Sequence, residues 1–176
     1  TDTPRFVRPR RIVNMNDEEQ VAQAEREGRV AGTDPLEIQA MRLFAQTFED
    51  RFRYNHTRGK WMEWTGFRWV SDEYKRAERE MIDLVDGIRQ VDPANRRSLG
   101  KISFSKNALA GAQSDPRMAV VMGDFDNEKT LIGTPTGYVD LDTGEHHKPD
   151  RTKMLSKAVG VSPAKGKPKR WLEFLD

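Results

Sequence analysis

The sequence RFRYNHTRGKWMEWTGFRWV, residues 51–70, places its aromatic residues in short runs separated by Thr57-Arg58-Gly59 and Thr65-Gly66. Short aromatic runs bounded by Gly and Thr are typical of strands joined by tight turns. The stretch therefore predicts two or three short antiparallel strands. Its alternation predicts that Trp61 is buried and that Glu63 faces outward.

Helical patterns flank these strands. Asp34-Pro35-Leu36-Glu37 has the composition of a helix start, and apolar residues then recur at helical spacing, so we expect a helix over about residues 35–49. A second helix is expected over about 72–91, with Ser71 as its cap and an apolar stripe that begins at Tyr74. A third is expected over about 95–113, with this inner face: Leu99, Ile102, Leu109 and Ala112.

From residue 130 the pattern returns to strands. Thr130-Leu131-Ile132 precedes a turn over 133–137, and residues 138–141 and 145–147 form a hairpin in which Gly144 can take a positive φ. Together the elements predict an α+β domain over 33–176, a small helical bundle with short antiparallel β-hairpins. Residues 1–32, basic at their start and then rich in Glu, Gln and Ala, predict a flexible N-terminal arm or linker.

The composition excludes several classes of site. Of the 176 residues 33% are charged, yet the net charge is only +2, so any affinity for nucleic acid must come from local patches. The absence of cysteine excludes disulfides, thiolate zinc sites and cysteine nucleophiles. No apolar run approaches the ~20 residues that span a bilayer, so no membrane partner is expected.

An ordered set of short motifs runs along residues 35–176. They are Arg53-Tyr54 through Trp61, Ser114-Asp115-Pro116, Phe125-Asp126, the segment from Gly137 to Gly144, and Trp171-Leu172-Glu173-Phe174-Leu175. In this order and spacing they resemble the domain immediately upstream of the superfamily-3 helicase in phage, plasmid and poxvirus primase-helicases. One departure is Thr136, which stands where that family's pattern has Asn before the glycine.

The resemblance implies a role in DNA replication, as the connector or collar between a primase module and an ATP-driven helicase ring. It implies single-stranded or forked DNA, the protein's own primase and helicase modules, and a homo-oligomeric ring, a hexamer, as partners. We expect a fragment cut before the motor, without catalysis of its own, so ATP and Mg²⁺ belong to that motor. The expected location is the cytoplasm of a bacterial host or of a virus-infected cell.

Two basic segments are the candidates for contact with DNA. In the first, aromatic residues alternate with cations, an arrangement that can stack bases and follow phosphates. In the second, residues 151–170, seven Lys and Arg and no Asp or Glu give a local charge of +7. The predicted DNA-binding residues are Arg53, Arg58, Lys60, Trp64, Arg68, Arg151, Lys153, Lys157, Lys165, Lys167, Lys169 and Arg170. The alternatives are aromatic core packing for the first segment and a solvated linker, balanced by nearby acids, for the second.

Two acidic pairs offer an alternative function as an enzyme. Asp124/Asp126 and Asp140/Asp142 each have the spacing that puts two carboxylates on one face of a strand, as in two-metal nucleotidyl transferases. Against this, both pairs fall in loop or turn sequence. The adjacent His146 and His147 would point to opposite faces of a strand, so no metal site is expected there. A phosphate-binding loop signature is absent. A pure protein-interaction module is the remaining alternative.

Overall fold

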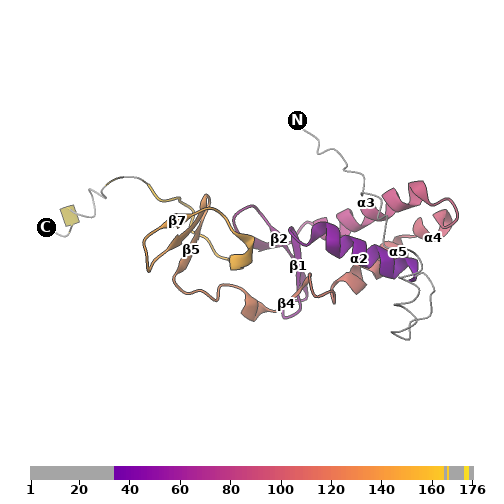
Figure 1. Cartoon of the computed structure of the whole chain (residues 1–176), viewed down its shortest axis with the longest axis horizontal. Coiled ribbons are helices and arrows are strands. Elements are labelled where there is room, and N and C mark those ends of the chain that lie inside the picture. Colours follow the sequence, from indigo (N-terminus) through magenta and orange to yellow (C-terminus); the bar gives the residue numbers. More distant parts are fainter. Residues whose placement is uncertain (1–33, 165, 167–172, 175–176) are drawn as a thin grey trace, which may run out of the picture. The chain divides into compact units, whose positions relative to one another are not determined.

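The computed structural model describes residues 34–164, 166 and 173–174 (Figure 1). The chain divides into two units, residues 1–35 and 36–176, and the elements below all belong to the second. They are α2 (Leu36–Phe48), β1 (Phe52–Asn55), β2 (Lys60–Trp64), β3 (Trp69–Ser71), α3 (Arg76–Val91), α4 (Arg96–Leu99), α5 (Ile102–Ala112), β4 (Ala119–Val120), the 3₁₀ turn η1 (Met122–Asp124), β5 (Leu131–Thr134), β6 (Gly137–Asp140), β7 (His146–His147) and η2 (Arg151–Lys153). The predicted α+β class is confirmed. The predicted arm over residues 1–32 lies outside the described residues.

The aromatic stretch forms three strands of a four-stranded sheet. The strand order is β3-β2-β1-β4, with β1–β2 and β2–β3 antiparallel, as predicted, and β1–β4 parallel. Both faces of this sheet carry apolar side chains, because alternate residues of each strand point to opposite faces. Phe52 and Trp61 pack with the helices, whereas Met62 and Trp69 pack with Phe125. The sheet is therefore the layer between two hydrophobic clusters.

The helices α2, α3 and α5 form the layer on the first face of the sheet (Figure 1). Phe44 of α2 lies fully buried among Phe48, Phe52 and Trp61, with ring centroids 4.9–6.2 Å away. Tilted and edge-on ring contacts at this spacing add to the free energy gained from the buried apolar area. The core-packing alternative for the aromatic residues of 51–70 is thus confirmed for Phe52, which is fully buried, whereas Trp61, predicted to be buried, is only partly buried against the helices.

The expected exposure of Glu63 is wrong. Trp61 and Glu63 are two residues apart on a strand and so share the face that meets the helices, where Glu63 is only 6% exposed. A buried carboxylate needs compensation, and it has two cationic partners. Arg51 donates to it at 3.0 Å from Nε, and Arg76 of α3 donates at 2.9 Å.

The start of α3 also differs from the prediction. Ser71 lies in β3 and does not cap the helix, because the strand pairing continues to Met62↔Ser71. The helix begins at Arg76, and the carboxylate of Asp72 accepts from the backbone N–H groups of Arg76 and Ala77, both at 2.9 Å. Tyr74 therefore precedes the helix and is 84% exposed instead of opening its buried stripe.

The third predicted helix is two helices, α4 and α5, separated by Gly100 and Lys101. Leu99, Leu109 and Ala112 are buried as expected. Ile102 is not, because the break makes it the first residue of α5, where its side chain is 57% exposed.

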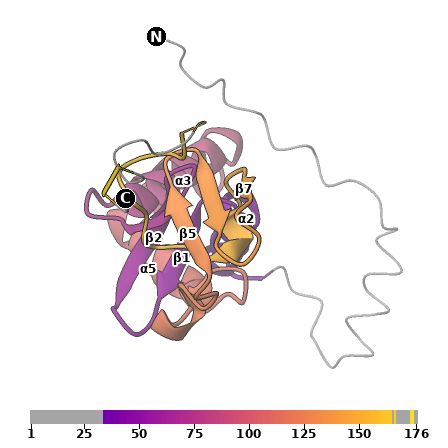
Figure 2. The same cartoon turned by 90° about the vertical axis from the view of Figure 1, so that its left-hand side faces the viewer.

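The strands β5, β6 and β7 form a separate antiparallel sheet, in which β5 and β6 run side by side (Figure 2). The chain reverses between them at Pro135-Thr136. Gly137, which follows, has φ +147°, and a Cβ there would lie 1.8 Å from the carbonyl oxygen of His147. Only glycine fits this close approach of two strands. Gly144 takes the positive φ predicted for it, +73°.

Asp115 holds the corner that leads from α5 to β4. Its carboxylate accepts from Nε of Arg117 at 2.9 Å, from Nη2 at 2.7 Å and from the backbone N–H of Arg117 at 3.0 Å. The side-chain hydrogen bonds from Arg117 hold the pKa of Asp115 below its usual value. These contacts give a physical role to the aspartate of the Ser114-Asp115-Pro116 motif.

We expect Asp115→Asn to lower the free energy of unfolding at pH 7 by about 1–3 kcal/mol, since a charge-assisted hydrogen-bond set is weakened. A depressed folded-state pKa stabilises the protein above the unfolded-state pKa of about 3.9, and this contribution is lost as pH falls through the folded value. The difference between native protein and variant should therefore shrink below about pH 4. Urea unfolding at several pH values measures it, and a difference that persists at low pH would contradict the assignment.

Candidate nucleic-acid interface

Three of the predicted DNA-contact residues meet around the buried indole of Trp69. The indole Nε1 donates to the carbonyl oxygen of Arg151 at 3.0 Å, and the guanidinium carbon of Arg53 lies 5.2 Å from the ring centroid. The ring of Trp64, which is half-buried, has its centroid 5.6 Å from that of Trp69. Arg53, Trp64, Trp69 and Arg151, which we call the Trp69 cluster, thus come from β1, β2, β3 and η2.

The two arginines of the Trp69 cluster have different surroundings. Burial lowers the pKa of Arg53, and the nearby positive charge of Arg151 lowers it further, against the opposing effect of Glu49 and Asp50. Arg53 donates to the carbonyl oxygens of Glu49 and Phe52, while Arg151 forms an ion pair with Asp50. The carboxylate of Asp50 already pairs with Arg151, so a phosphate would bind these guanidinium groups by taking the place of that carboxylate.

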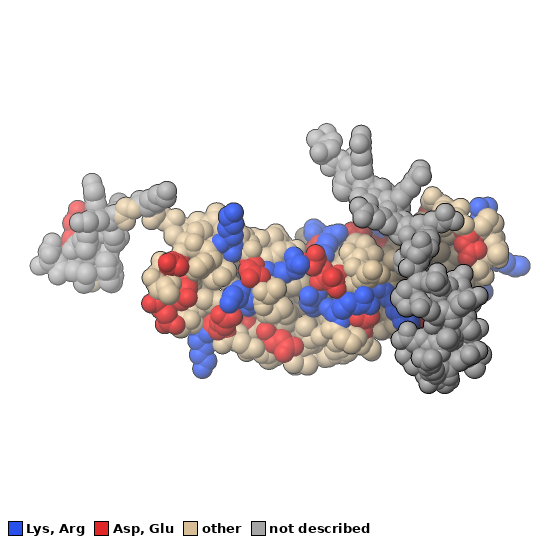
Figure 3. Space-filling view, in the orientation of Figure 1, with Lys and Arg blue, Asp and Glu red and all other residues tan. Residues whose placement is uncertain are grey.

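The basic segment 151–170 is partly balanced by acids in space. Lys153 pairs with Glu128 at 3.0 Å, and this hydrogen bond raises the pKa of the lysine. Within the described residues, Lys157 is bonded through its backbone N–H, which donates to the carboxylate of Asp126 at 3.3 Å, and its side chain forms no ion pair. Acidic and basic side chains are likewise interspersed on the face shown in Figure 3. Lys165, Lys167, Lys169 and Arg170 lie outside the described residues.

The remaining candidates have other contacts. Arg58 sits in the β1–β2 turn, where its backbone N–H donates to Asn55, and the neighbouring Lys60 pairs with Glu73 at 3.3 Å. Arg68 lies over the ring of Phe67 at 5.6 Å, and its buried Nε has no hydrogen-bond partner in the described part of the chain.

Tyr74, an exposed aromatic residue outside the predicted set, is a further candidate for contact with DNA. Tyr74 follows Glu73, the partner of Lys60, and its ring is exposed with the Arg76 guanidinium 5.6 Å away. The helical pattern assigned Tyr74 to the buried stripe of α3. Asp72 is the signal that could have given the correct start of the helix, because an Asp four residues before Arg76 can cap a helix that begins there. Tyr74 would then have been placed before the helix.

The acidic pairs are engaged in local structure. Asp124 accepts from the backbone N–H of Val121 at 2.8 Å, and Asp140 accepts from that of Asp142 at 2.9 Å. Asp126 has φ +54° and binds Ser156 through both the backbone N–H, at 2.8 Å, and the hydroxyl, at 2.6 Å. Among residues 34–164, 166 and 173–174, no three His, Asp or Glu side chains gather as metal ligands.

The histidines are also held within the small sheet. Nε2 of His146 lies 3.2 Å from Oγ1 of Thr136, and the ring of His147 stacks on Tyr138 at 5.0 Å. Thr136, the partner of His146, is the residue that stands in place of the Asn of the motif. The two histidines have separate partners, as expected from their opposite directions on a strand.

A family model described as "D5 N terminal like" matches residues 41–176. The chain belongs to this family. The match begins at Met41, within α2, and runs to the end of the sequence, so it includes the Trp69 cluster and every motif that carried the resemblance. The D5 N terminal like domain is the N-terminal domain of D5-type primase-helicases, which places the chain in the context of DNA replication. No curated protein matches the chain. None of the helices in the described residues is long and apolar enough to cross a bilayer.

We expect Asp126→Ala to destabilise the domain by about 1–3 kcal/mol, because Ser156 loses both of its bonds and alanine tolerates the left-handed conformation poorly. Asp142→Ala, at an exposed position, is the control and should change the free energy of unfolding by less than about 0.5 kcal/mol. Urea unfolding measures both. If Asp126→Ala has the same free energy of unfolding as the native chain, the structural role of Asp126 is wrong, and a role for Asp124 and Asp126 as metal ligands returns as the alternative.

Proposed function

We propose that the chain is the accessory domain of a phage- or plasmid-type primase-helicase, linking a primase module to a superfamily-3 helicase motor and contacting single-stranded or forked DNA. The Trp69 cluster carries the proposal. In it, the buried indole of Trp69 contacts the guanidinium group of Arg53, the ring of Trp64 and the backbone carbonyl of Arg151. The cluster lies inside the part of the chain that matches the D5 N terminal like family.

The cluster supplies the two kinds of contact that single strands need. Arginine guanidinium groups bind phosphate through several N–H donors in a fixed geometry. An exposed part of a tryptophan ring stacks on a base at ~1–3 kcal/mol, without preference for sequence. Arg53, Arg151 and Trp64 therefore suit a domain that holds a strand without reading it.

In this proposal the chain performs no chemistry. ATP and Mg²⁺ act in the helicase motor, and copies of the whole protein assemble as a ring, a hexamer, around DNA in the cytoplasm of a bacterial or infected host cell. The backbone roles of Asp126 and Asp140 support this assignment over a nucleotidyl transferase, because carboxylates that cap turns are poorly placed to share a metal.

The direct test is binding of the chain to a fluorescent single-stranded oligonucleotide at several salt concentrations. Each phosphate contact contributes about −0.7 to the log–log slope, so Arg53→Gln with Arg151→Gln should reduce the slope by about 1.4. Lys106→Gln, which removes one exposed cation on α5, is the control for each single Arg→Gln variant and should leave the slope unchanged.

Two further variants sharpen the assignment. Trp64→Leu should weaken binding at every salt concentration and leave the slope as it is, since stacking releases no counterions. Changing Lys165, Lys167, Lys169 and Arg170 together to Gln measures the other predicted contacts. A native chain with a slope near zero would contradict the proposal and favour a protein-interaction module.

A further inference from the structure

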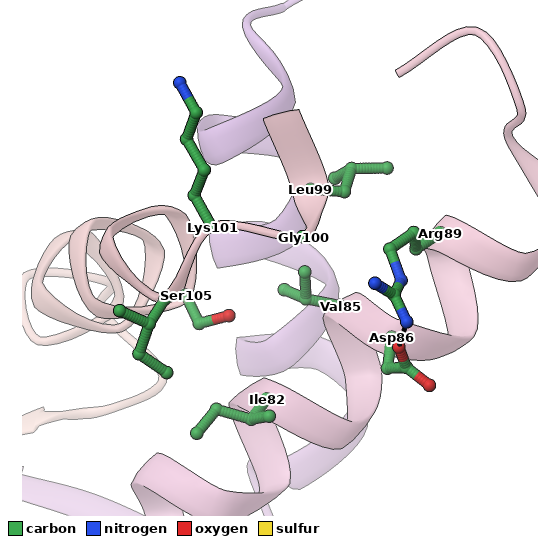
Figure 4. Close-up of a pocket in the computed structure, with 9 residues that line it drawn as sticks. Ile82, Val85, Asp86, Arg89, Leu99, Gly100, Lys101 and Ser105 are labelled. Carbon is green, nitrogen blue, oxygen red and sulfur yellow. Dashed lines mark ion pairs between the residues drawn. The ribbon is translucent and has the colours of Figure 1, made fainter. Parts of the chain in front are cut away.

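A small hollow lies where α3, α4 and α5 meet (Figure 4). It has a volume of about 120 Å³, and its lining includes Val85, Leu99, Ile82 and Ile102. Val85 and Leu99 are buried, whereas Ile102 is largely exposed. Small-molecule sites have volumes of about 300–1,000 Å³, so this hollow suits one aliphatic side chain better than a cofactor.

Cations stand at the edge of the hollow. Lys101, which is exposed, and Arg89 both line the hollow (Figure 4). Arg89 forms an ion pair with Asp86 at 2.6 Å. The exposed Arg96 and Arg97 belong to α4, the same short helix as Leu99. The hollow therefore fits an apolar side chain that is flanked by acidic residues.

The loop between β6 and β7 presents such a side chain. Leu141 is 57% exposed, and it stands between Asp140 and Asp142, with Glu145 at the end of the loop. Asp142 makes no ion pair within the described residues, so its charge is available to a partner. An exposed leucine among carboxylates is the chemical complement of the hollow.

The loop is held rigidly. The backbone N–H groups of Leu141, Asp142 and Gly144 donate to Thr130, to the Asp140 carboxylate and to the Asp140 carbonyl, at 2.7–2.9 Å. The N–H of Glu145 donates to the hydroxyl of Thr143 at 3.2 Å. A loop that is already ordered loses little conformational entropy on binding, which favours its use as a contact.

The hollow and the loop belong to different layers of the domain. The hollow lies among helices that pack on Phe52 and Trp61, on the first face of the four-stranded sheet. The loop belongs to the small sheet of β5, β6 and β7, which takes no part in that helical cluster. A contact between them therefore suits two copies of the chain.

We propose that Leu141 of one copy inserts into the α3–α5 hollow of the next, with Asp142 and Glu145 facing Lys101 and Arg89. The contact is heterologous, because the two partners use different surfaces, and such contacts build closed rings or open chains. This inference deepens the proposed function by naming the surfaces through which copies of the chain would meet.

The experiment uses sedimentation velocity of the whole chain, without DNA. The native chain at about 100 µM should form dimers and larger species, as expected for a small, weak interface. Leu141→Asp and Ile102→Asp should each be monomeric. Both positions are exposed, so near-ultraviolet circular dichroism should stay native, and Val161→Asp, at another exposed aliphatic residue, should associate like the native chain.

Mixing the two defective variants gives the decisive result. Leu141→Asp keeps a working hollow and Ile102→Asp keeps a working loop, so their mixture should form a dimer and nothing larger. A mixture that stays monomeric while the native chain associates overturns the proposal, as does a native chain that is monomeric at about 100 µM. Dimers formed by either variant alone would overturn it too.

Charge reversal tests the rim separately. Lys101→Glu or Asp142→Lys alone should weaken association about two- to fivefold, and the two together should restore it. If the double variant associates no better than the single variants, the proposed pairing of Lys101 with Asp142 is wrong. Because DNA is absent throughout, failure here leaves the DNA contacts of the Trp69 cluster standing, and loss of those contacts leaves this interface standing.

Discussion

The hydrogen bond from the buried indole of Trp69 to the carbonyl oxygen of Arg151 joins the sheet to the C-terminal part of the described domain. A buried indole N–H needs an acceptor, and here the acceptor is a backbone group of η2. The backbone N–H of Trp69 adds a second bond, to Leu155 at 2.8 Å, and Asp126 fixes Ser156 next to it. The position of Arg151 beside Arg53 follows from these bonds. The candidate interface is therefore a consequence of how the sheet packs on its second face.

The elements with strong local signals could be predicted from the sequence. Residues 51–70 carry aromatic runs and turn residues in direct succession, and they form β1, β2 and β3 as predicted. The helical period of α2 and the turn at Gly144 are equally local. Residues 41–176 belong to the D5 N terminal like family, in agreement with the resemblance drawn from the ordered motifs.

The features that depend on distant partners could not be predicted. Glu63 can be buried because two arginines donate hydrogen bonds to its carboxylate: Arg51, which directly precedes β1, and Arg76, the first residue of α3. The basic charge of 151–170 appeared unopposed along the sequence, yet Arg151 and Lys153 find Asp50 and Glu128. Neither pairing has a signal in the spacing of residues, since the chain must fold before these charges meet.

The most direct test of the account is the salt dependence of single-strand binding by Trp69→Phe. This variant keeps an aromatic ring and every charge but removes the N–H that holds Arg151. If the indole positions Arg151 for phosphate, the slope should fall by about 0.7, one phosphate contact, with no cation deleted. An unchanged slope in a folded variant would contradict the claim that the indole of Trp69 positions Arg151 for phosphate.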